Sequence, residues 1–317
     1  IKAMALIGMS IGLSFAAAMI LGPLLNDWVG VPGIFWITAV LALGGILVVA
    51  FVVPRPQITA VHREAEAVPA QFGRVLRKVE LLRLDFGILM LHAILTASFV
   101  VLPLILRDQA GVASGDHWMI YLPVLVFSVL AMLPFIILAE RRGHIRAVFL
   151  GAISLLVIVE LGLYFVPVSL ASMVVLMFFF FMAFNLLEAM LPSLISRVAP
   201  VDCRGTAMGF YSSSQFLGAF VGGSLGGLLQ GLYGIQAVFL CAALGALAWL
   251  VLAWPMTQPL KLSSYIYRLE PGMSVDREVL TRQLAGLAGV TEAVVVAEEG
   301  VAYLKVDKRI FDASALP

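Results

Sequence analysis

Charged residues are scarce in this chain. Lys and Arg together number 20 and Asp and Glu 19 among 317 residues, so only 12% of the sequence is charged while 62% is hydrophobic. Soluble domains are about a quarter charged and about half apolar, and the mean hydropathy here is +1.05. These proportions exclude a soluble globular protein and indicate a polytopic membrane protein.

Cysteine is also rare, and its placement excludes several kinds of site. Cys203 and Cys241 belong to no CxxC pair and no Cys/His cluster, so neither a disulfide framework nor a thiolate metal site is expected. The sequence has no phosphate-cradling loop of an ATP-driven pump and no nucleophile–base spacing of an intramembrane enzyme. No cofactor, no metal and no enzymatic activity are expected. The net charge of +1 gives no reason to expect nucleic acid as a partner.

Long apolar runs fill most of the chain. Eight of them are long enough to cross a bilayer as helices, which rise about 1.5 Å per residue. A chain of this kind belongs to the all-α membrane proteins. The predicted spans are Ala3–Leu25, Ile34–Val53, Leu84–Leu106, His117–Ala139, Ile145–Val166, Leu170–Ser196, Gly205–Gly231 and Ile235–Met256.

The basic residues lie in alternate junctions between these spans. The junctions near 26–33, 107–116, 167–169 and 232–234 contain a single basic residue, Arg107, whereas those near 54–83, 140–146 and 197–204 contain eleven. Cytoplasmic loops of membrane proteins are enriched in Lys and Arg. The second set of junctions, together with the tail after residue 257, is therefore predicted to face the cytoplasm.

The first span repeats features of the seventh. Lys2-Ala3-Met4 corresponds to Thr206-Ala207-Met208 at an offset of 204, and the same offset pairs Gly22 with Gly226. The two six-helix halves of major facilitator transporters are related in this way. On that register, residues 1–53 are the last two helices of a first half, four spans precede Ile1, and 84–257 is the second half. The chain by itself is then not expected to transport.

Residues 54–83 are predicted to link the two halves. Phe72, Val75, Leu76, Val79 and Leu82 fall on one face of a helix near the end of this segment. Two interpretations stay open: an amphipathic helix at the cytoplasmic membrane surface, or a solvated linker helix with no contact to lipid.

The tail, 261–317, reads as a separate small domain of α+β type. Strands are predicted at Ser263–Glu270, Thr291–Ala297 and Val301–Asp307, with a helix from Val275 to about Leu287. The order β-α-β-β is typical of a ferredoxin-like split βαβ domain. A second helix is only indicated at 312–316, so the domain is predicted to be incomplete.

The sequence LPSLISRVAPVDCRGTAMGFYSSSQFLGAFVGGSLGG, residues 191–227, resembles the tenth and eleventh helices of YajR-type major facilitator proteins. Those are bacterial inner-membrane exporters of drugs or sugars with a small cytoplasmic ferredoxin-like C-terminal domain. The resemblance covers the whole chain. It implies the last eight of twelve helices of a major facilitator fold, a multi-pass protein of the bacterial inner (plasma) membrane, a monomer, and a cytoplasmic C-terminal domain.

Two shorter motifs agree in part with that family. Gly8, Gly12 and Gly22-Pro23 resemble the glycine-proline motif of antiporter fifth helices, although Asn26-Asp27 stands where that motif has a glycine pair. The segment AERRGHIR, residues 139–146, resembles the second-half copy of the acidic/basic loop motif. Within it, Glu140, Arg141, Arg142 and Arg146 are predicted to gate the cytoplasmic side by approaching the start of the first span near Lys2, or else only to fix the topology of the chain.

Few residues inside the spans can be charged, and each is costly in hydrocarbon. Glu188 is the leading candidate for proton coupling, since it lies about 14 Å from Arg197 along its helix and a desolvated carboxyl there can bind and release a proton. His92 lies at a similar depth and can pair with it. Asn185 lies one turn before Glu188. Glu160 is expected near the outer end of its span, where it can reach water. For each of these residues a purely structural role is the alternative.

The seventh span combines polar and small residues. Tyr211, Ser214 and Gln215 form a polar belt that either contacts substrate or bonds across helices. Gly218, Gly222 and Gly226 recur every four residues, which lets a neighbouring backbone approach closely in lipid.

These observations favour a secondary active transporter. The predicted activity is proton-coupled efflux of a small molecule, such as a drug or sugar, by alternating access. Its partners are that substrate, protons and the lipid bilayer, and the C-terminal domain is expected to contact a ligand or a protein. The alternative is a non-transporting receptor or scaffold that signals through that domain.

Overall fold

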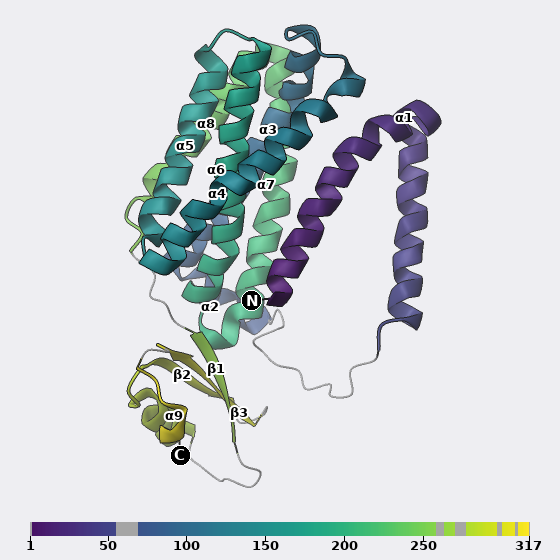
Figure 1. Ribbon diagram of the computed structural model, residues 1–317. Coiled ribbons are helices and arrows are strands. Elements are labelled where there is room, and N and C mark those ends of the chain that lie inside the picture. The colour runs from purple at the N-terminus through teal and green to yellow at the C-terminus, as the bar shows by residue number, and fades with distance from the viewer. Residues whose placement is uncertain are drawn as a thin grey trace.

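The structure is a computed structural model that describes residues 2–54, 69–257, 263–269, 277–296, 300–307 and 310–316. Long helices make up most of it, and a small sheet lies beyond one end of them (Figure 1). The helices are α1 (Lys2–Phe51), α2 (Phe72–Leu76), α3 (Val79–Asp108), α4 (Trp118–Arg142), α5 (Ile145–Phe165), α6 (Leu170–Val198), α7 (Arg204–Tyr233), α8 (Ile235–Ala253) and α9 (Arg277–Ala285). Short 3-10 turns are η1 (Pro69–Gln71), η2 (Ser114–Asp116), η3 (Val201–Cys203) and η5 (Ala313–Ala315).

Helices α3 to α8 form one bundle. Helix α3 packs against α7, α8 and α6, and α5 packs against α8 and α6. Two of the chain reversals depend on glycine, because Gly143 between α4 and α5 has φ 74° and Gly234 between α7 and α8 has φ 86°. A Cβ is costly in that left-handed region. The predicted spans from 84 to 256 thus lie in six helices packed side by side.

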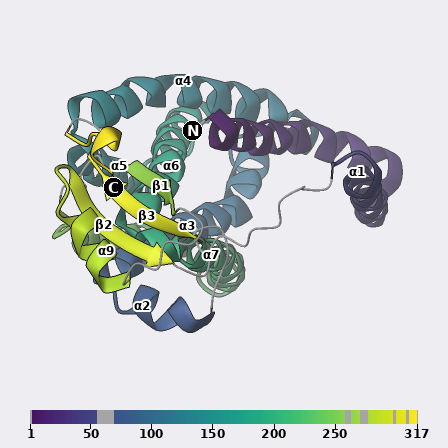
Figure 2. The same ribbon diagram turned by 90° about the horizontal axis from the view of Figure 1, so that it is seen from below.

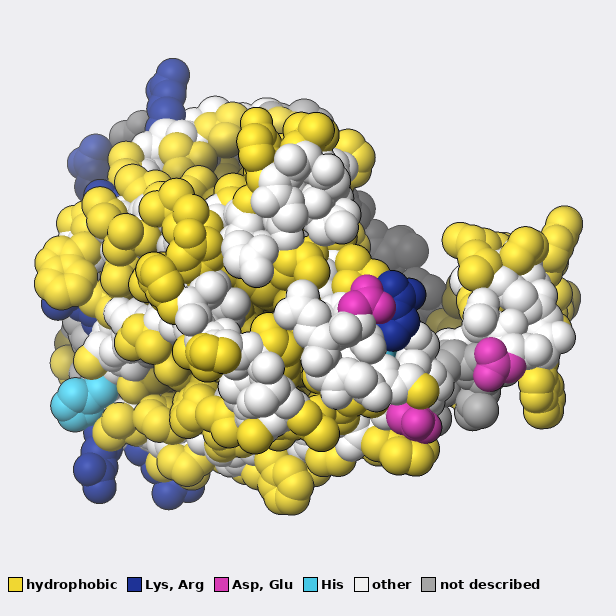
Figure 3. Space-filling view, turned by 90° about the horizontal axis from the view of Figure 1, so that it is seen from above, with side chains coloured by type: hydrophobic (Ala, Val, Ile, Leu, Met, Phe, Trp, Pro, Cys, Tyr) yellow, Lys and Arg dark blue, Asp and Glu magenta, His cyan; other side chains and the backbone are white. Residues whose placement is uncertain are grey.

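The bundle is apolar both inside and outside. Its largest fully buried side chains include Trp249, Phe149, Phe180, Phe181 and Phe239. Many leucines, valines and phenylalanines are also exposed on its outer faces, as a lipid-facing surface requires. The view onto the end away from the sheet shows mostly hydrophobic side chains with few charged ones among them (Figure 3). Within the described chain, seven helical segments are long and apolar enough to cross a membrane.

Helix α1 contains the first two predicted spans in one helical run that breaks at Gly30. This glycine has φ 67° and ψ 175°, and Pro32 two residues later disfavours helix just before it. The two arms diverge at the break, one leaning toward α4 and the other standing apart from the bundle (Figures 1 and 2). The segment Leu25–Phe51, which includes the break and the second arm, qualifies as a span. Most side chains of the predicted span Ala3–Leu25 lie outside the described residues.

The linker differs from the predicted amphipathic helix. Helix α2 has only five residues, and the chain leaves helical geometry at Lys78 before α3 begins at Val79. Val75 is fully buried, and the ring of Phe72 packs edge-on against Phe210 of α7 at 5.0 Å between centroids. Val75 and one side of the Phe72 ring thus pack on the bundle, while Phe72 and Leu76 stay 42% and 46% exposed.

The C-terminal domain has the predicted β-α-β-β order. Its strands are β1 (Ser263–Arg268), β2 (Val290–Val296) and β3 (Val301–Val306), and β3 lies in the middle, antiparallel to both neighbours. Strands β1 and β2 are thus parallel to each other with one strand between them, the arrangement of a split βαβ unit. In place of the second helix indicated at 312–316, the chain forms the 3-10 turn η5.

Strand β3 is buried on both faces. Ala302, Leu304 and Val306 pack in the cluster that includes residues of α9. Tyr303 and Lys305, which alternate with them, point to the opposite face, and they are 0% and 6% exposed. Strands β2 and β3 both contact η3, the turn that joins α6 to α7. The second face of the sheet is therefore buried against the end of the helical bundle.

Candidate functional site

Three polar side chains from three helices meet inside the bundle. Gln215 of α7 places its Nε2 atom 2.9 Å from His92 Nε2 of α3 and 3.3 Å from Glu188 Oε1 of α6. His92 Nε2 lies 3.9 Å from Glu188 Oε2. The predicted pair of His92 and Glu188 is thus brought together, and Gln215 bridges it.

The hydrogen bonds define the tautomer of His92. Its Nδ1 atom lies 3.3 Å from the carbonyl oxygen of Ile88, one turn earlier, and can only donate there. Its Nε2 atom then accepts from the amide of Gln215, whose second N–H donates to Glu188. Both amide protons of Gln215 are used, and the imidazole is neutral. Glu188 Oε2 accepts no hydrogen bond in the described part of the chain.

Other predicted members of the site lie around this cluster. Asn185 does not join it, because its Nδ2 atom donates to Ser128 Oγ of α4 at 3.2 Å. Tyr211 lies one turn before Gln215 and is buried, and its hydroxyl has no hydrogen-bond partner among the described residues. Ser214 is half-buried. The polar belt of α7 therefore contributes one bridging amide and one buried hydroxyl to the interior.

The expectation for Glu160 is wrong. Its side chain does not reach water at the end of α5 but is 0% exposed, and Ser98 Oγ of α3 donates to its Oε1 atom at 3.1 Å. Ser98 is itself fully buried. Depth along the helix alone could not predict this, because the Glu160 side chain faces α3 while Ile158 of the same helix is 63% exposed.

The loop between α4 and α5 makes contacts within the bundle. Glu140 accepts two hydrogen bonds from Arg197 Nη2 at the end of α6, at 2.7 and 2.9 Å, and Arg146 donates to the carbonyl of Trp254. Arg141 and Arg142 are exposed. The predicted contact with Lys2 involves a side chain that lies outside the described residues. The surroundings of Gly8, Gly12 and Pro23 are not described either. A Cβ added at Gly22 would meet no neighbouring side chain or helix within 4 Å.

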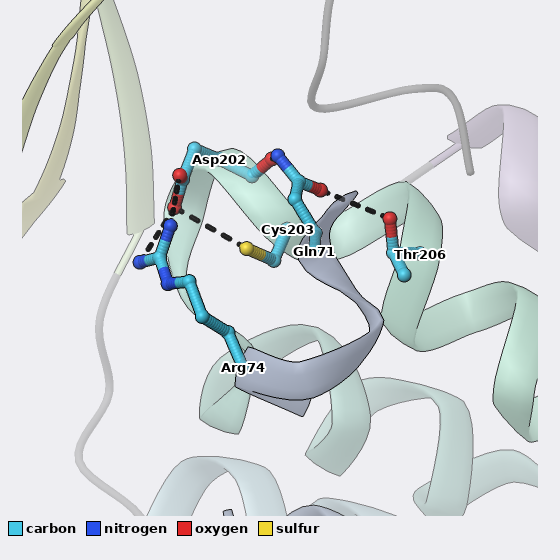
Figure 4. Close-up of polar contacts among 5 residues, drawn as sticks. All are labelled: Gln71, Arg74, Asp202, Cys203 and Thr206. Carbon is cyan, nitrogen blue, oxygen red and sulfur yellow. Dashed lines mark hydrogen bonds and ion pairs between the residues drawn. The ribbon is translucent and has the colours of Figure 1, made fainter. Parts of the chain in front are cut away.

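A second polar cluster holds the linker to the α6–α7 turn (Figure 4). Arg74 of α2 donates to both carboxylate oxygens of Asp202, at 2.5 and 3.3 Å. The amide of Gln71 donates to the Asp202 carbonyl and accepts from the Thr206 hydroxyl, each at 2.9 Å. The hydrogen bond that Arg74 donates to Asp202 raises the pKa of Arg74 above its usual value. These contacts fix η1 and α2 to the start of α7.

Three cationic side chains meet the C-terminal end of α6. Lys78 from the linker donates to the carbonyl of Val198 at 2.8 Å, and Lys305 from β3 donates to that of Ala199 at 2.7 Å. Arg204 from α7 donates to the carbonyl of Ser196 at 3.3 Å. The last carbonyls of a helix lack intrahelical partners and carry partial negative charge. The linker, the bundle and the C-terminal domain thus share one helix end.

A cavity of about 560 Å³ opens at the same junction. Arg74 and Asp202 line one side, and residues of α9 and β2 line the other, among them Thr281, Arg282 and Val294. Asp202 and Lys305 were not selected as site residues from the sequence. The feature of the sequence that could have indicated this junction is the charged turn with Arg197, Asp202 and Arg204, which lies between two apolar spans.

Cys203 can report on this junction. Its thiol is buried, and burial together with the neighbouring Asp202 carboxylate raises its pKa from 9.0 to about 11. At pH 8 a shift of this size lowers the thiolate fraction by about 100-fold, and only the thiolate is alkylated. We expect iodoacetamide to modify Cys203 at least tenfold more slowly than it modifies an unfolded control peptide, followed by mass spectrometry in a Cys241→Ser background. Arg74→Ala should accelerate the reaction by opening the junction; equal rates in both variants would contradict the assignment.

No metal centre is evident in the described ranges, where no group of three or more His, Cys, Asp or Glu residues comes together. The interior cluster and the junction are therefore sites of charge and hydrogen bonding. Both belong to a bundle of apolar helices with a small split βαβ domain at one end.

Comparison with known proteins is consistent with this architecture. The model of the Major Facilitator Superfamily matches residues 1–184 and 84–270, and that of the YajR YAM domain matches 268–314. The chain is 41% identical over 310 residues to the inner membrane transport protein YajR of Escherichia coli, covering 98% of this chain and 68% of that protein. It is 30% identical over 224 residues to an uncharacterized transporter of Buchnera aphidicola, covering 70% and 57%. The chain belongs to the major facilitator superfamily and carries a YajR YAM domain.

Proposed function

We propose that this transporter couples the efflux of a small molecule to protons, with Glu188 as the proton-carrying group. The observation that supports the proposal is the cluster of Glu188, Gln215 and His92 in the bundle interior. Ionisable residues within membrane spans are expensive and usually functional. The relatives named as transport proteins favour transport over the alternative of a receptor or scaffold.

The cluster has two protonation patterns with different hydrogen bonds. With His92 neutral, Gln215 donates to both His92 and Glu188. If His92 Nε2 gains a proton, it can no longer accept from the amide, and Gln215 has to turn its oxygen toward the ring. That turn removes the hydrogen bond to Glu188. Proton gain at one residue is therefore linked to the environment of the other.

Glu188 can exchange protons with water when the bundle opens toward one side of the membrane. Its side chain is 36% exposed while its Oε2 atom is buried without a hydrogen-bond donor in the described chain. A carboxylate oxygen with no donor in a low-dielectric interior is costly, and a proton removes that cost. Movement of the two halves during alternating access would change the exposure of this oxygen, and with it the tendency of Glu188 to hold a proton.

We place the protein in the inner membrane with the YAM domain in the cytoplasm. The location follows from the name of the Escherichia coli relative, and the orientation from the basic residues at the end of the bundle that contacts the sheet. The division into 1–53, 54–83, 84–257 and 261–317 is proposed on the same grounds. The substrate class, a drug or a sugar, is proposed from the family resemblance.

The test uses the complete transporter in liposomes with an imposed pH gradient and a lumenal pH dye. Amphipathic drugs and sugars are added to wild type, to Glu188→Gln and to Glu160→Gln. We expect a transported compound to dissipate the gradient in wild type and Glu160→Gln, and Glu188→Gln to lose at least 90% of that rate, since an amide keeps the shape but carries no exchangeable acid proton. Equal rates in wild type and Glu188→Gln would show that Glu188 does not carry the proton.

A further inference from the structure

Asp85 is a buried carboxylate that the proposed coupling does not yet use. It lies in α3, is 7% exposed, and its Oδ1 atom has no hydrogen-bond partner in the described part of the chain. A structural carboxylate in such a place would be held by an arginine, a lysine or backbone N–H groups. A buried acid without such partners needs another explanation.

Asp85 and His92 lie on one face of α3. They are seven residues apart, which is two helical turns or about 10 Å. Helix α3 packs closely along α7, and the two helices start at the same end of the bundle, where Lys78 and Arg204 both bind the end of α6. Gly218 of α7 approaches the backbone of Leu89. Asp85 lies one turn before Leu89 and Tyr211 two turns before Gly218, so both lie on the sides by which α3 and α7 meet.

Tyr211 of α7 lies one turn before Gln215, whose amide reaches Glu188. Its hydroxyl is buried and has no hydrogen-bond partner among the described residues. Three buried oxygen atoms without donors, Asp85 Oδ1, Tyr211 Oη and Glu188 Oε2, thus occur on three adjacent helices. Buried oxygens without donors are rare in native structures, so each of the three requires an explanation.

The depths of these groups form a series from the end that contacts the YAM domain. Asp85 is the seventh residue of α3 and Tyr211 the eighth of α7, so both lie about 10 Å in. Glu188 is the eleventh residue from the end of α6, or about 15 Å in. Gln215 and His92 follow, deeper in the bundle. The distance of these polar groups from that end therefore increases from Asp85 and Tyr211 to the proposed coupling cluster.

We propose that Asp85 and Tyr211 form the path by which protons pass between the cytoplasmic side and Glu188. Because these three oxygens make no direct hydrogen bond to one another, each transfer passes through an intervening water: Asp85 gives its proton toward the oxygen of Tyr211 while the hydroxyl proton of Tyr211 passes on to Glu188 Oε2. The tyrosine stays neutral, the negative charge moves from Glu188 to Asp85, and Asp85 takes a new proton from cytoplasmic water. The reverse sequence releases a proton. This inference rests on the proposed role of Glu188.

Few other charges face this path. Helix α8, which packs on α3, carries no Asp, Glu, Lys, Arg or His. In the linker, Arg74 is bound to Asp202 and Lys78 to the Val198 carbonyl. From α6 the facing acid is Glu188, and on α3 itself His92 lies beyond it. Asp85 is therefore the acid of the described chain placed between Glu188 and the junction end.

The experiment measures how fast Glu188 is protonated in the complete transporter held in lipid nanodiscs. Rapid-scan infrared spectroscopy after a downward pH jump follows the carboxylic acid band, and the part due to Glu188 is identified by its loss in Glu188→Gln. We expect Asp85→Asn and Tyr211→Phe to slow that protonation at least tenfold with an unchanged end point. Glu80→Gln, an exposed acid on the same helix, should leave the rate unchanged, and Asp85→Glu should restore most of it.

The outcomes separate the two proposals. If the Glu188 band appears at the wild-type rate in Asp85→Asn and in Tyr211→Phe, the path is overturned while the role of Glu188 stands. If no part of the band depends on Glu188, the proposed function fails and the path fails with it. Since Tyr211→Phe keeps the ring and removes only the hydroxyl, it tests the path even if Asp85→Asn does not fold.

Discussion

Replacing Gly222 with valine is expected to prevent α3 and α7 from packing and to leave little folded protein. A Cβ at Gly222 would lie 2.1 Å from the carbonyl oxygen of Ala93 and 2.3 Å from Thr96 Oγ1. Thr96 Oγ1 also donates to the Ala219 carbonyl at 2.9 Å, so the helices meet through backbone and cannot yield by a rotamer change. Overpacking of this kind costs about 1–3 kcal/mol for small insertions and more for branched ones.

The neighbouring glycine provides the matched control. A Cβ at Gly223 has nothing within 4 Å, so Gly223→Ala and Gly223→Val should fold normally. Alanine there should gain up to about 1 kcal/mol from helix propensity. The measurement is thermal unfolding in detergent, followed by size-exclusion recovery. Similar losses at positions 222 and 223 would show that glycine content, rather than the contact with α3, decides stability.

Reversing the charge of Lys305 is expected to release the YAM domain from the helical bundle. Lys305 is 6% exposed, and its Nζ atom donates to the Ala199 carbonyl at 2.7 Å. The same Nζ atom lies 3.9 Å from Glu292 Oε2. Lys305→Glu would place a second carboxylate beside Glu292 and against the negative end of α6. Breaking a buried charge contact costs about 3–5 kcal/mol, which is about a hundredfold or more in the fraction undocked.

Hydrogen exchange of β3 and of the η3 backbone measures this release. Both should lose protection in Lys305→Glu, and Lys305→Met should lie between it and wild type. Arg77→Glu, an exposed cation of the linker, serves as the control and should behave as wild type. Unchanged protection in Lys305→Glu would mean that apolar contacts such as those of Tyr303 suffice for docking.

Docking should also depend on pH through Lys305. Burial lowers the pKa of Lys305 from its usual 10.5, so the undocked domain binds more protons in the window between the lowered value and 10.5. Docking should therefore strengthen as pH rises through that window. The pKa of Cys203 is raised from 9.0 to about 11, so its titration should weaken docking as pH rises. The comparison is therefore made in a Cys203→Ser background. There, Lys305→Met should remove the dependence of docking on pH.

The sequence predicted the elements better than their contacts. Apolar length and the β-α-β-β pattern of the tail required little more than local information. In the linker, the apolar periodicity runs on into α3, but the chain leaves helical geometry at Lys78, which reaches the end of α6. Contact of this segment with the membrane surface stays a prediction. The position of Glu160 was wrong because no local pattern shows which neighbours cover a residue.

The candidate site was predicted by chemical type and completed by the tertiary structure. Glu188 and His92 were identifiable because charge is rare and costly in an apolar span. Their bridging by Gln215 was not identifiable, nor was the departure of Asn185 toward Ser128. Residues 92, 188 and 215 are far apart in the chain, so their meeting depends on how α3, α6 and α7 pack.

The sequence by itself determined that the chain lies in a membrane, which segments from residue 84 on are helical, and that a small α+β domain follows them. These properties depend on transfer of side chains from water and on backbone propensity, which act locally. Only the tertiary structure decided that cations from three segments bind the end of α6 and that Gln215 bridges His92 and Glu188. Such contacts depend on the relative positions of helices, because an electrostatic or hydrogen-bonding partner is defined by distance in space rather than along the chain.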